Sequence, residues 1–548
     1  SSHSWLKLKQ VWLKGALRLP IERASTLVDA STFAIEHSLK LDQHSMTIAK
    51  SDARVIAKAE EEEEEEEEEE MEKCQTDSSP NSAWFWVEMS LLNLCSVMWS
   101  ADDQLLPAVF LELSIHFDVG PAQLGMLTLM RGLSESIFAF PAGFLADRVS
   151  RPLLICLSCL LWAAGLAGCA LAPNFDFLLA CRFINGIGLG LVRPLMFSLV
   201  ADKTPPRSRG FAFGMIQFTG NAGNTAFTSI ATVLASHTIC GLLGWQFVFY
   251  MIALLSAAVG IAIWLCVSEP PREQKESASK LSAFMESMPL VWRIFKTPTF
   301  IIIIAQGVFG TIPWMSFSYF TMWLQLSCFS HAQSATIWAC FNAASACGAL
   351  VFGRVLDCVA NRFPDHGVQS MVQISVGSSI PFLAVLFYGL GKRQGGDDNV
   401  LLFCVYFFVM GSIISWGMFC NNKMFSNIVP RAAFTHVYAM DRFVEGVLSA
   451  SGGPLVGLLT EKVFDYNADN GSKGICSPHD AASLGNGMFV VCSITFALCF
   501  LCWCFAHYYY PRDRDNAKAL EAELEAEKAK AKAQDENVST GMVVTLEA

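Results

Sequence analysis

Charged side chains are scarce in this sequence, and a single segment holds many of those that are present. Asp, Glu, Lys and Arg make up 16% of the 548 residues, where about a quarter is usual for soluble domains. Residues 60–70 are eleven consecutive glutamates, so setting this run aside reduces the formal net charge from -12 to -1. No basic patch remains that would suggest binding to DNA or RNA, and we expect no nucleic-acid partner.

The sequence also lacks the residue constellations typical of an enzyme active site. It contains no HExxH or phosphate-loop motif, and no paired-carboxylate, Ser/His/Asp or Cys/His arrangement lies on an extramembrane domain. Cys156 and Cys159 have CxxC spacing, but they lie in the middle of an apolar run, which favours packing in lipid over metal binding. We therefore expect no enzymatic activity, no cofactor and no metal site.

Long hydrophobic runs, by contrast, are abundant. Hydrophobic residues make up 53% of the chain and its mean hydropathy is +0.40, which is too apolar for an ordinary soluble protein. From residue 83 onward, runs of roughly 20 or more mainly apolar residues recur, which is the length of helix that crosses a ~30 Å hydrocarbon core. The twelve runs lie at residues 84–114, 122–147, 152–173, 176–202, 209–236, 244–268, 299–327, 331–357, 369–391, 399–427, 431–460 and 485–509. We therefore predict an all-α membrane protein with twelve transmembrane helices, surrounded by the lipid bilayer.

A polar segment divides these runs into two sets of six. Residues 269–298 contain Pro, Lys and Arg, and we predict that they form a cytoplasmic linker between six-helix bundles at residues 83–268 and 299–510. We expect residues 1–82, which include the glutamate run, to be a largely disordered N-terminal extension, and residues 511–548 to be a C-terminal tail. The basic, amphipathic residues 5–19 fit an organelle transit peptide, a membrane-surface helix or an unstructured extension.

Lys and Arg are distributed unequally between the predicted loops. If the N-terminus is cytoplasmic, sixteen of them lie on the cytoplasmic side and four on the opposite side, and positive residues are retained in the cytoplasm. We therefore expect both termini to be cytoplasmic, while the identity of the membrane stays open. Only Cys240, Cys328 and Cys476 lie near predicted non-cytoplasmic loops, so any disulfide would involve these cysteines.

A short signature occurs twice, 210 residues apart, each time where an apolar run ends in charged residues. The first copy contains Gly143, Asp147, Arg148 and Arg151, and the second contains Gly353, Asp357 and Arg362. A small residue followed by a carboxylate and cations at the membrane surface makes a hinge-like junction against a neighbouring helix. Two copies at matching places indicate a duplicated membrane protein. The distribution of positive charge places both copies on the cytoplasmic face, where we expect them to act as gates.

Ionisable residues within the predicted spans are the candidates for chemistry, because charge is costly in lipid. Asp102 and Asp103 point about 100° apart on a helix, so we expect one to face a cavity and the other to find a helix partner. A cation or proton site and a structural ion pair are equally open for them. Arg182 and Arg193 lie eleven residues apart and project on one face roughly 16 Å from each other. Unpaired, they would attract an anionic group or a carboxylate such as Asp103.

Two further acid and base combinations lie within the spans. Arg131 and Glu135 are four residues apart and are expected to form a structural pair. Asp441 and Glu445 share a helix face, so one of them is expected to take up a proton unless Arg442 pairs with either. This makes them a secondary proton-site candidate, with pairing to Arg442 as the alternative. Of the tryptophans, Trp99, Trp314 and Trp416 are candidates for a cavity, and Asn421, Asn422 and Lys423 are expected at the cytoplasmic gate.

These motifs resemble those of the major facilitator superfamily. The doubled signature is similar to its cytoplasmic loop motif, Arg182 with Gly186, Gly188 and Gly190 to its fourth-helix motif, and Asp202 with Arg207 and Arg209 to the junction before its fifth helix. Residues 101–109, 185–189 and 438–442 resemble spinster-like members of plants and protists.

The resemblance implies alternating access by two rocking bundles. It also implies that Asp147 meets the start of helix eleven, and that Arg148 or Arg151 meets Asp202, which would hold the cytoplasmic side closed. Cys358 stands where a basic residue often follows the Asp, so the second latch is expected to be weaker. Helix five lacks the Gly-Pro pair of drug antiporters, which disfavours drug-proton exchange.

The sequence therefore predicts a monomeric secondary transporter of a small organic solute, with proton coupling through Asp102 or Asp103 near Arg182. A lipid-like substrate is the leading subclass, and an organic anion, carboxylate or sugar is the alternative. The rival function is a transport-inactive sensor or scaffold with the same fold, which would not need acids in the middle of the membrane.

Overall fold

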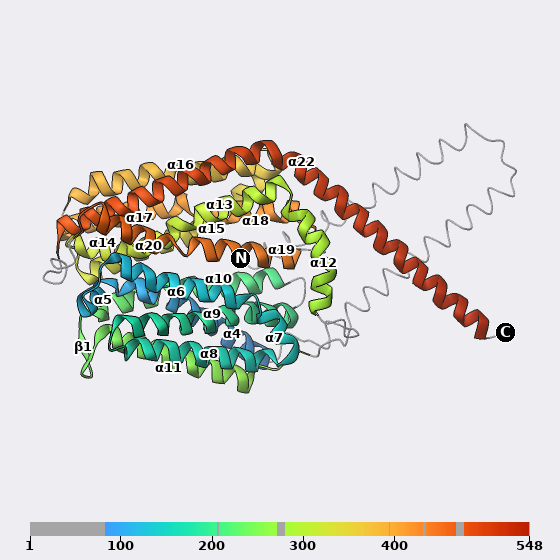
Figure 1. Ribbon diagram of the computed structural model, residues 1–548, viewed down its shortest axis with the longest axis horizontal. Coiled ribbons are helices and arrows are strands. Elements are labelled where there is room, and N and C mark those ends of the chain that lie inside the picture. The colour runs from blue at the N-terminus through green and yellow to red at the C-terminus, as the bar shows by residue number, and fades with distance from the viewer. Residues whose placement is uncertain are drawn as a thin grey trace, which may run out of the picture. The chain divides into compact units, whose positions relative to one another are not determined.

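The computed structural model describes residues 83–204, 208–270, 280–393, 395–430, 434–466 and 476–546, and these residues are largely helical (Figure 1). The predicted N-terminal extension, residues 1–82, lies outside the described residues. Of the predicted C-terminal tail, residues 511–546 continue the last helix.

Each apolar run of the predicted N-terminal half coincides with helix in the structure. The elements are α4 (Ala83–Ala108), α5 (Phe110–Phe117), α6 (Pro121–Ala139), α7 (Ala142–Arg148), α8 (Arg151–Ala170), α9 (Phe175–Lys203), α10 (Arg209–Ala235), β1 (Thr238–Ile239), β2 (Leu242–Leu243) and α11 (Gly244–Cys266). The first run breaks into α4 and α5 just after Pro107, because proline cannot donate a helical hydrogen bond. The two strands pair antiparallel, and Gly241 turns between them with a φ of 80°.

The runs of the predicted C-terminal half also coincide with helix. The elements are α12 (Lys280–Phe295), α13 (Pro298–Ser316), η1 (Phe317–Tyr319), α14 (Phe320–Leu326), α15 (His331–Arg362), α16 (Gly367–Ala384), η2 (Val385–Gly389), η3 (Leu390–Lys392), α17 (Asp397–Ile414), α18 (Gly417–Ile428), α19 (Phe434–Ser449), α20 (Gly452–Lys462) and α22 (Pro478–Leu546). The eleventh run divides into α19 and α20 just before Gly452, Gly453 and Pro454, residues that weaken a helix.

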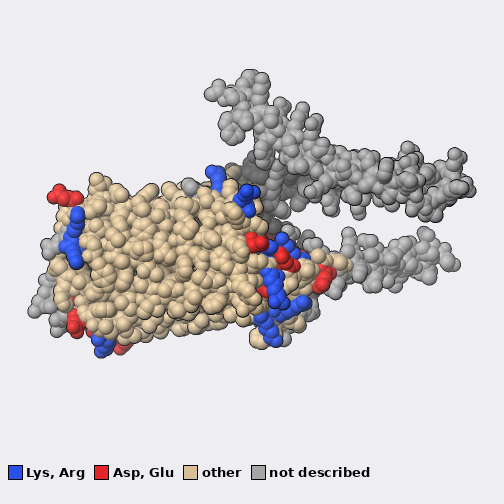
Figure 2. Space-filling view, turned by 90° about the horizontal axis from the view of Figure 1, so that it is seen from above, with Lys and Arg blue, Asp and Glu red and all other residues tan. Residues whose placement is uncertain are grey.

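Seven segments of the described chain are long and apolar enough to cross a membrane. They are Arg151–Ala170, Phe175–Lys203, Gly244–Cys266, Pro298–Leu326, Gly367–Lys392, Val437–Lys462 and Pro478–Leu524. On the face in Figure 2, Lys, Arg, Asp and Glu gather near two ends, and the surface between them carries none. An uncharged band of this kind is the surface that lipid tails require. The full count of twelve spans stays a prediction.

The helices pack mainly with others of the same predicted half. In the N-terminal half α9 packs against α6 and α8, and α10 against α4; in the C-terminal half α15 packs against α17, and α22 against α13 and α16. The two halves meet where α6 packs against α19 and α20, and where α10 packs against α15. The buried hydrophobic residues form one continuous core across both halves.

The predicted linker contains a helix that the polar composition of this segment did not indicate. Helix α12 packs against α13 and α19 of the C-terminal half and against α7 of the N-terminal half, and in Figure 1 it runs crosswise to its neighbours. Val291 and Ile294 are buried, while Trp292 is exposed. The linker is therefore a docked segment at the end of the protein that carries the repeated signature.

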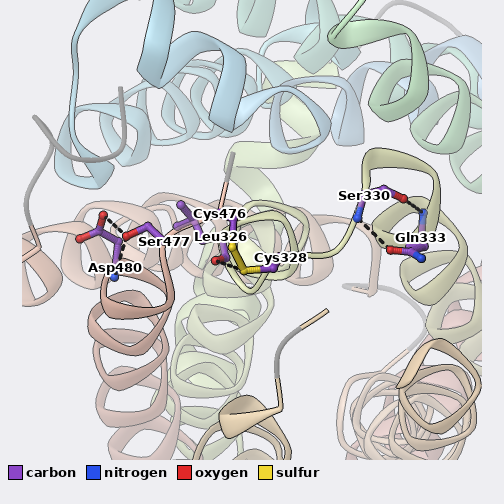
Figure 3. The surroundings of a disulfide bond; sticks show 7 residues. All are labelled: Leu326, Cys328, Ser330, Gln333, Cys476, Ser477 and Asp480. Atoms are coloured by element: carbon purple, nitrogen blue, oxygen red, sulfur yellow. Dashed lines mark hydrogen bonds between the residues drawn. A yellow bond between two sulfur atoms is a disulfide. The ribbon is translucent and has the colours of Figure 1, made fainter. Parts of the chain in front are cut away.

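A disulfide joins Cys328, which follows α14, to Cys476, which precedes α22 (Figure 3). The Ser477 amide donates to the Leu326 carbonyl at 3.0 Å beside it, so the backbone also pairs at this point. Both cysteines are among the three that the sequence placed near non-cytoplasmic loops. The third, Cys240, is a free and exposed thiol.

Candidate functional site

Asp102 lies at the centre of a buried charge cluster. Arg131 of α6 places its Nε 3.3 Å from Asp102 Oδ2 and its Nη1 2.7 Å from Asp103 Oδ1. Its Nη2 also lies 3.4 Å from Glu135 Oε2, so the predicted Arg131–Glu135 pair exists but belongs to a larger cluster. The Asp102 side chain is 0% exposed and that of Asp103 is 36% exposed, so the two neighbouring acids differ sharply in access to solvent.

Of the two acids that the sequence placed near Arg182, Asp102 is the one that Arg182 meets. Arg182 Nη1 lies 3.7 Å from Asp102 Oδ1, and the Asn185 amide donates to the same oxygen at 3.4 Å. Arg182 is only 1% exposed. Within the described residues, its Nε and Nη1 make no hydrogen bond, so this buried guanidinium has donors to spare.

Glycines allow α9 to bring Arg182 this close to α4 and α6. A Cβ added at Gly186 would lie 2.5 Å from the Arg131 carbonyl oxygen of α6, and one added at Gly188 would lie 2.5 Å from the Ser158 carbonyl oxygen of α8. Real Cβ atoms do not approach backbone so closely. A larger residue at either glycine would push α9 away and separate Arg182 from Asp102.

Arg193, the second arginine on this face of α9, has different surroundings. It is exposed, and its guanidinium lies over the Trp99 ring, 4.5 Å from the ring centroid, and 6.0 Å from that of Phe197. Phe197 in turn stacks on Phe213 of α10 with ring centroids 5.5 Å apart. Arg193 also acts electrostatically on Glu135. The two predicted arginines therefore have different environments: Arg182 is buried beside an acid, and Arg193 lies on an aromatic surface.

We call the set Asp102, Asp103, Arg131, Glu135, Arg182 and Arg193 the N-half cluster. The negative charges of its three acids and the positive charges of its three arginines sum to zero when all six groups are ionised. A neutral sum is the arrangement that a low-dielectric interior tolerates best.

The C-terminal half holds a smaller cluster on α19. Arg442 Nη2 lies 2.8 Å from Asp441 Oδ2 and 2.7 Å from Glu445 Oε2, so the arginine pairs with both acids. The Thr311 hydroxyl of α13 donates to Glu445 Oε1 at 2.5 Å. Asp441 is 0% and Glu445 8% exposed, and Asp441 Oδ1 accepts no hydrogen bond from any described residue. Two buried acids share one arginine here, so the set is neutral only when it also carries a proton.

The first copy of the repeated signature takes part in a network within the N-terminal half. Arg151 Nη1 lies 2.5 Å from Asp202 Oδ2, and Arg151 Nε lies 2.8 Å from Glu269 Oε1, which follows α11. Of the two arginines expected to meet Asp202, Arg151 makes the contact and Arg148 is exposed. Gly143 and Asp147 lie in α7, but the surroundings of their side-chain positions, and residues 431–433 at the predicted start of helix eleven, lie outside the described residues.

The second copy makes a weaker contact. Lys423 Nζ of α18 lies 2.9 Å from Asp357 Oδ1, and these side chains are 38% and 63% exposed. An exposed pair of this kind contributes little to stability. Arg362 is exposed, and Gly353 lies within α15. That either copy of the signature acts as a latch, and that the second is the weaker, stays a prediction.

The sequence analysis missed the residues that join the two halves at the opposite end. The Ala122 amide of α6 donates to Glu461 Oε1 of α20 at 2.8 Å, and the Tyr319 hydroxyl donates to the Pro121 carbonyl at 2.6 Å. His331 Nδ1 of α15 lies 3.3 Å from Glu112 Oε1 of α5. These contacts hold the halves together at the end where the disulfide also lies. A polar residue near the edge of an apolar run was their only signal in the sequence.

Comparison with known proteins identifies the fold. The sequence model of the Major Facilitator Superfamily matches residues 92–390. A bacterial homolog to the human lysosomal transporter Spinster, solved in an inward-facing and occupied conformation, superposes with a TM-score of 0.65 at 18% identity. The match covers 79% of this chain and 99% of that chain. A D-xylose-proton symporter superposes with a TM-score of 0.58 at 14% identity, over 75% of this chain and 97% of that one.

Curated relatives match over shorter stretches. The quinolone resistance protein NorA of Staphylococcus aureus is 26% identical over 190 residues, which cover 34% of this chain and 47% of NorA. The niacin transporter NiaP of Acinetobacter baylyi is 28% identical over 151 residues, which cover 28% of this chain and 32% of NiaP. The chain thus spans about half or less of the length of these relatives. The family model covers more than half of the sequence, and the chain therefore belongs to the Major Facilitator Superfamily of multi-pass membrane proteins.

Proposed function

We propose that the protein is a secondary transporter that carries a small organic anion by alternating access and couples its movement to a proton. The observation that carries this proposal is the charge balance of the N-half cluster, in which the buried Arg182 keeps unused donors beside the buried Asp102, and the neighbouring Asp103 is partly open to solvent. Membership of a family of transporters supports transport as the general activity and an enzymatic role is not expected.

Charge balance links the anion to the proton. When all six groups of the N-half cluster are ionised, an incoming anion adds one negative charge in a region of low dielectric. A carboxyl group that takes up a proton restores neutrality, and Asp103 is the acid best placed to do so because its side chain is 36% exposed. Linkage is reciprocal, so a proton on Asp103 raises the affinity for the anion by the same factor.

The surroundings of the arginines favour an anion with an apolar or aromatic part. Arg193 lies over Trp99, and Phe197 extends the same surface, so a flat or acyl group can pack there while its negative charge meets a guanidinium. Niacin, named for one of the relatives, is an aromatic carboxylate of this kind. A single-chain phospholipid, with a phosphate and an acyl tail, also fits this chemistry and the predicted lipid-like substrate.

Alternating access fits the distribution of contacts between the halves. They are joined at the Ala122–Glu461 end, whereas the signature contacts at the other end, Arg151–Asp202 and Asp357–Lys423, each lie within one half. We assign the end of the protein that carries the repeated signature to the cytoplasm, as the Lys and Arg distribution predicts, and we place both termini on that side. We further propose twelve spans in two bundles and a monomer as the working unit. In this assignment the described conformation is closed on the non-cytoplasmic side. The cluster on α19, with its one unbalanced acid, is a second place for a coupled proton.

Reconstitution into liposomes that contain a pH-sensitive dye tests the proposal. We expect saturable uptake of nicotinate or lysophosphatidate to be accompanied by an internal pH change, and xylose to produce neither. Asp103→Asn should abolish the pH change, while Asp398→Asn, at an exposed acid outside both clusters, serves as the matched control. Anion uptake without proton movement would refute the coupling, and no uptake of any panel compound would favour a transport-inactive role.

A further inference from the structure

Two titratable side chains that belong to neither charge cluster meet across the interface between the halves. Glu112 belongs to α5 of the N-terminal half, and His331 is the first residue of α15 in the C-terminal half. Their Oε1 and Nδ1 atoms lie 3.3 Å apart, with side chains 11% and 17% exposed. A close carboxylate and imidazole, both largely shielded from solvent at a contact that must separate during alternating access, form a place where protonation can control movement.

The neighbouring groups act mainly on His331 and not on Glu112. Gln325 Nε2 of α14 lies 3.0 Å from His331 Nδ1 and does not titrate. His237, which follows α10, is a titratable group that acts electrostatically on His331, and the Thr232 backbone of α10 pairs with the imidazole. His116, on the same helix as Glu112, packs instead against the Trp245 ring. Both carboxylate oxygens of Glu112 are buried and make no hydrogen bond with any described residue.

The lone pairs at this contact favour a proton on Glu112. Gln325 Nε2 is an amide donor, so His331 Nδ1 accepts from it and presents its lone pair, and an ionised Glu112 oxygen 3.3 Å away is repelled by that nitrogen. Burial adds a second condition, because an uncompensated carboxylate is costly away from water. The pair is neutral when Glu112 is protonated beside a neutral His331, or when an ionised Glu112 meets an imidazolium. Each neutral form holds one proton more than the form with a bare carboxylate and a neutral ring.

We infer that Glu112 and His331 together form a proton-binding site whose protonated form holds the two halves closed at the end of the protein that carries the Cys328–Cys476 disulfide. Loss of the proton leaves a net negative charge in the contact, and separation of the halves then allows water to solvate Glu112. Because the closed state binds this proton more tightly than the open state, acid favours closure and alkali favours opening. The inference rests on the alternating access proposed above and adds a proton site separate from the N-half cluster.

Distance measurement across this end tests the inference. Spin labels carried by non-canonical amino acids replace Leu171 and Lys392, which are exposed and belong to opposite halves, because the 19 cysteines preclude thiol labelling. Pulsed electron resonance on the full chain in nanodiscs then gives the label separation from about pH 5 to about pH 8, the range in which His titrates. We expect the longer separation to gain population several-fold as the pH rises.

Two conservative variants separate this site from other inter-half contacts. Glu112→Gln keeps the shape of the side chain but not its charge, so the short separation should persist at every pH; His331→Gln should also remove the pH response. Glu461→Gln, at the neighbouring contact that involves a backbone amide, should shift the populations but keep their pH dependence. A pH response that survives Glu112→Gln unchanged, or that Glu461→Gln abolishes equally, would overturn the inference and leave alternating access intact. A separation that is identical in all variants and at every pH would overturn alternating access as well.

Discussion

Replacement of Asp102 by Asn tests whether the N-half cluster is a set of coupled charges. The substitution keeps the size of the side chain and removes its charge. Arg131 retains Asp103 and Glu135, at 2.7 and 3.4 Å, whereas the ion pair from Arg182 to Asp102 Oδ1 at 3.7 Å is lost. Arg182 would then be a buried cation without its acid.

The expected cost follows from the distance and the burial. Two unit charges separated by 3.7 Å interact by about 4.5 kcal/mol at an effective dielectric constant of about 20. Removing one member of a buried ion pair typically lowers the free energy of unfolding by about 3–5 kcal/mol, because the remaining charge stays uncompensated. Asp103→Asn should cost about 1 kcal/mol, because the Asp103 side chain is 36% exposed and water replaces part of the interaction.

A double-mutant cycle measures this coupling. The free energy of unfolding is obtained by SDS titration in mixed micelles for wild type, Asp102→Asn, Arg182→Met and the variant with both changes. Removal of the lone cation in the double variant should recover much of the loss, which gives a coupling energy of about 3 kcal/mol. Strictly additive effects, or equal losses for Asp102→Asn and Asp103→Asn, would refute the assignment of Asp102 as the buried partner of Arg182.

Three further outcomes are expected. Arg193→Lys loses the planar contact with the aromatic surface. It should raise the KM for the anion about five- to thirtyfold, as for a loss of about 1–2 kcal/mol, with little change in the maximal uptake rate. An unchanged KM would show that this residue does not contact the substrate. Replacing Cys328 and Cys476 by Ser should lower the free energy of unfolding by about 2–4 kcal/mol, which thermal melts would detect. Uptake should stay intact because both cysteines lie in one half, and loss of uptake at full stability would contradict this. Asp202→Asn should slow uptake about tenfold, as for a loss of about 1.4 kcal/mol, because its partner Arg151 is only 7% exposed. Asp357→Asn, whose partner Lys423 is 38% exposed, should change uptake less than about twofold. Equal effects would show that the burial of the two cations does not distinguish the two copies of the signature.

Much of the fold follows from local properties of the sequence. The length and apolarity of a run determine whether it forms a helix that suits a membrane, and each predicted run coincides with helix in the structure. Some contacts were also predicted in part. Of Arg148 and Arg151, which the family resemblance brought to Asp202, Arg151 makes the contact. The disulfide joins Cys328 and Cys476, two of the three cysteines near predicted non-cytoplasmic loops, although the sequence required no disulfide.

The partners of buried residues were harder to predict, because they depend on the register between helices. Whether Arg182 reaches Asp102 or Asp103 is decided by how far Gly186 and Gly188 let α9 approach its neighbours, and a single sequence does not contain that displacement. The contact between Glu112 and His331 depends on the packing of two halves against each other. Helix α12 escaped notice because its apolar residues are too few for a span, although Val291 and Ile294 are enough to dock it.

The central claim is that binding of the anion takes up a proton at the N-half cluster. Calorimetric titration of the transported anion into the detergent-solubilised protein, repeated in buffers of different ionisation enthalpy, gives the number of protons taken up on binding. The charge balance of the cluster predicts about one proton per bound anion, and none in Asp103→Asn. Binding to the wild-type protein with no proton uptake at any pH between about 5 and about 8 would contradict it.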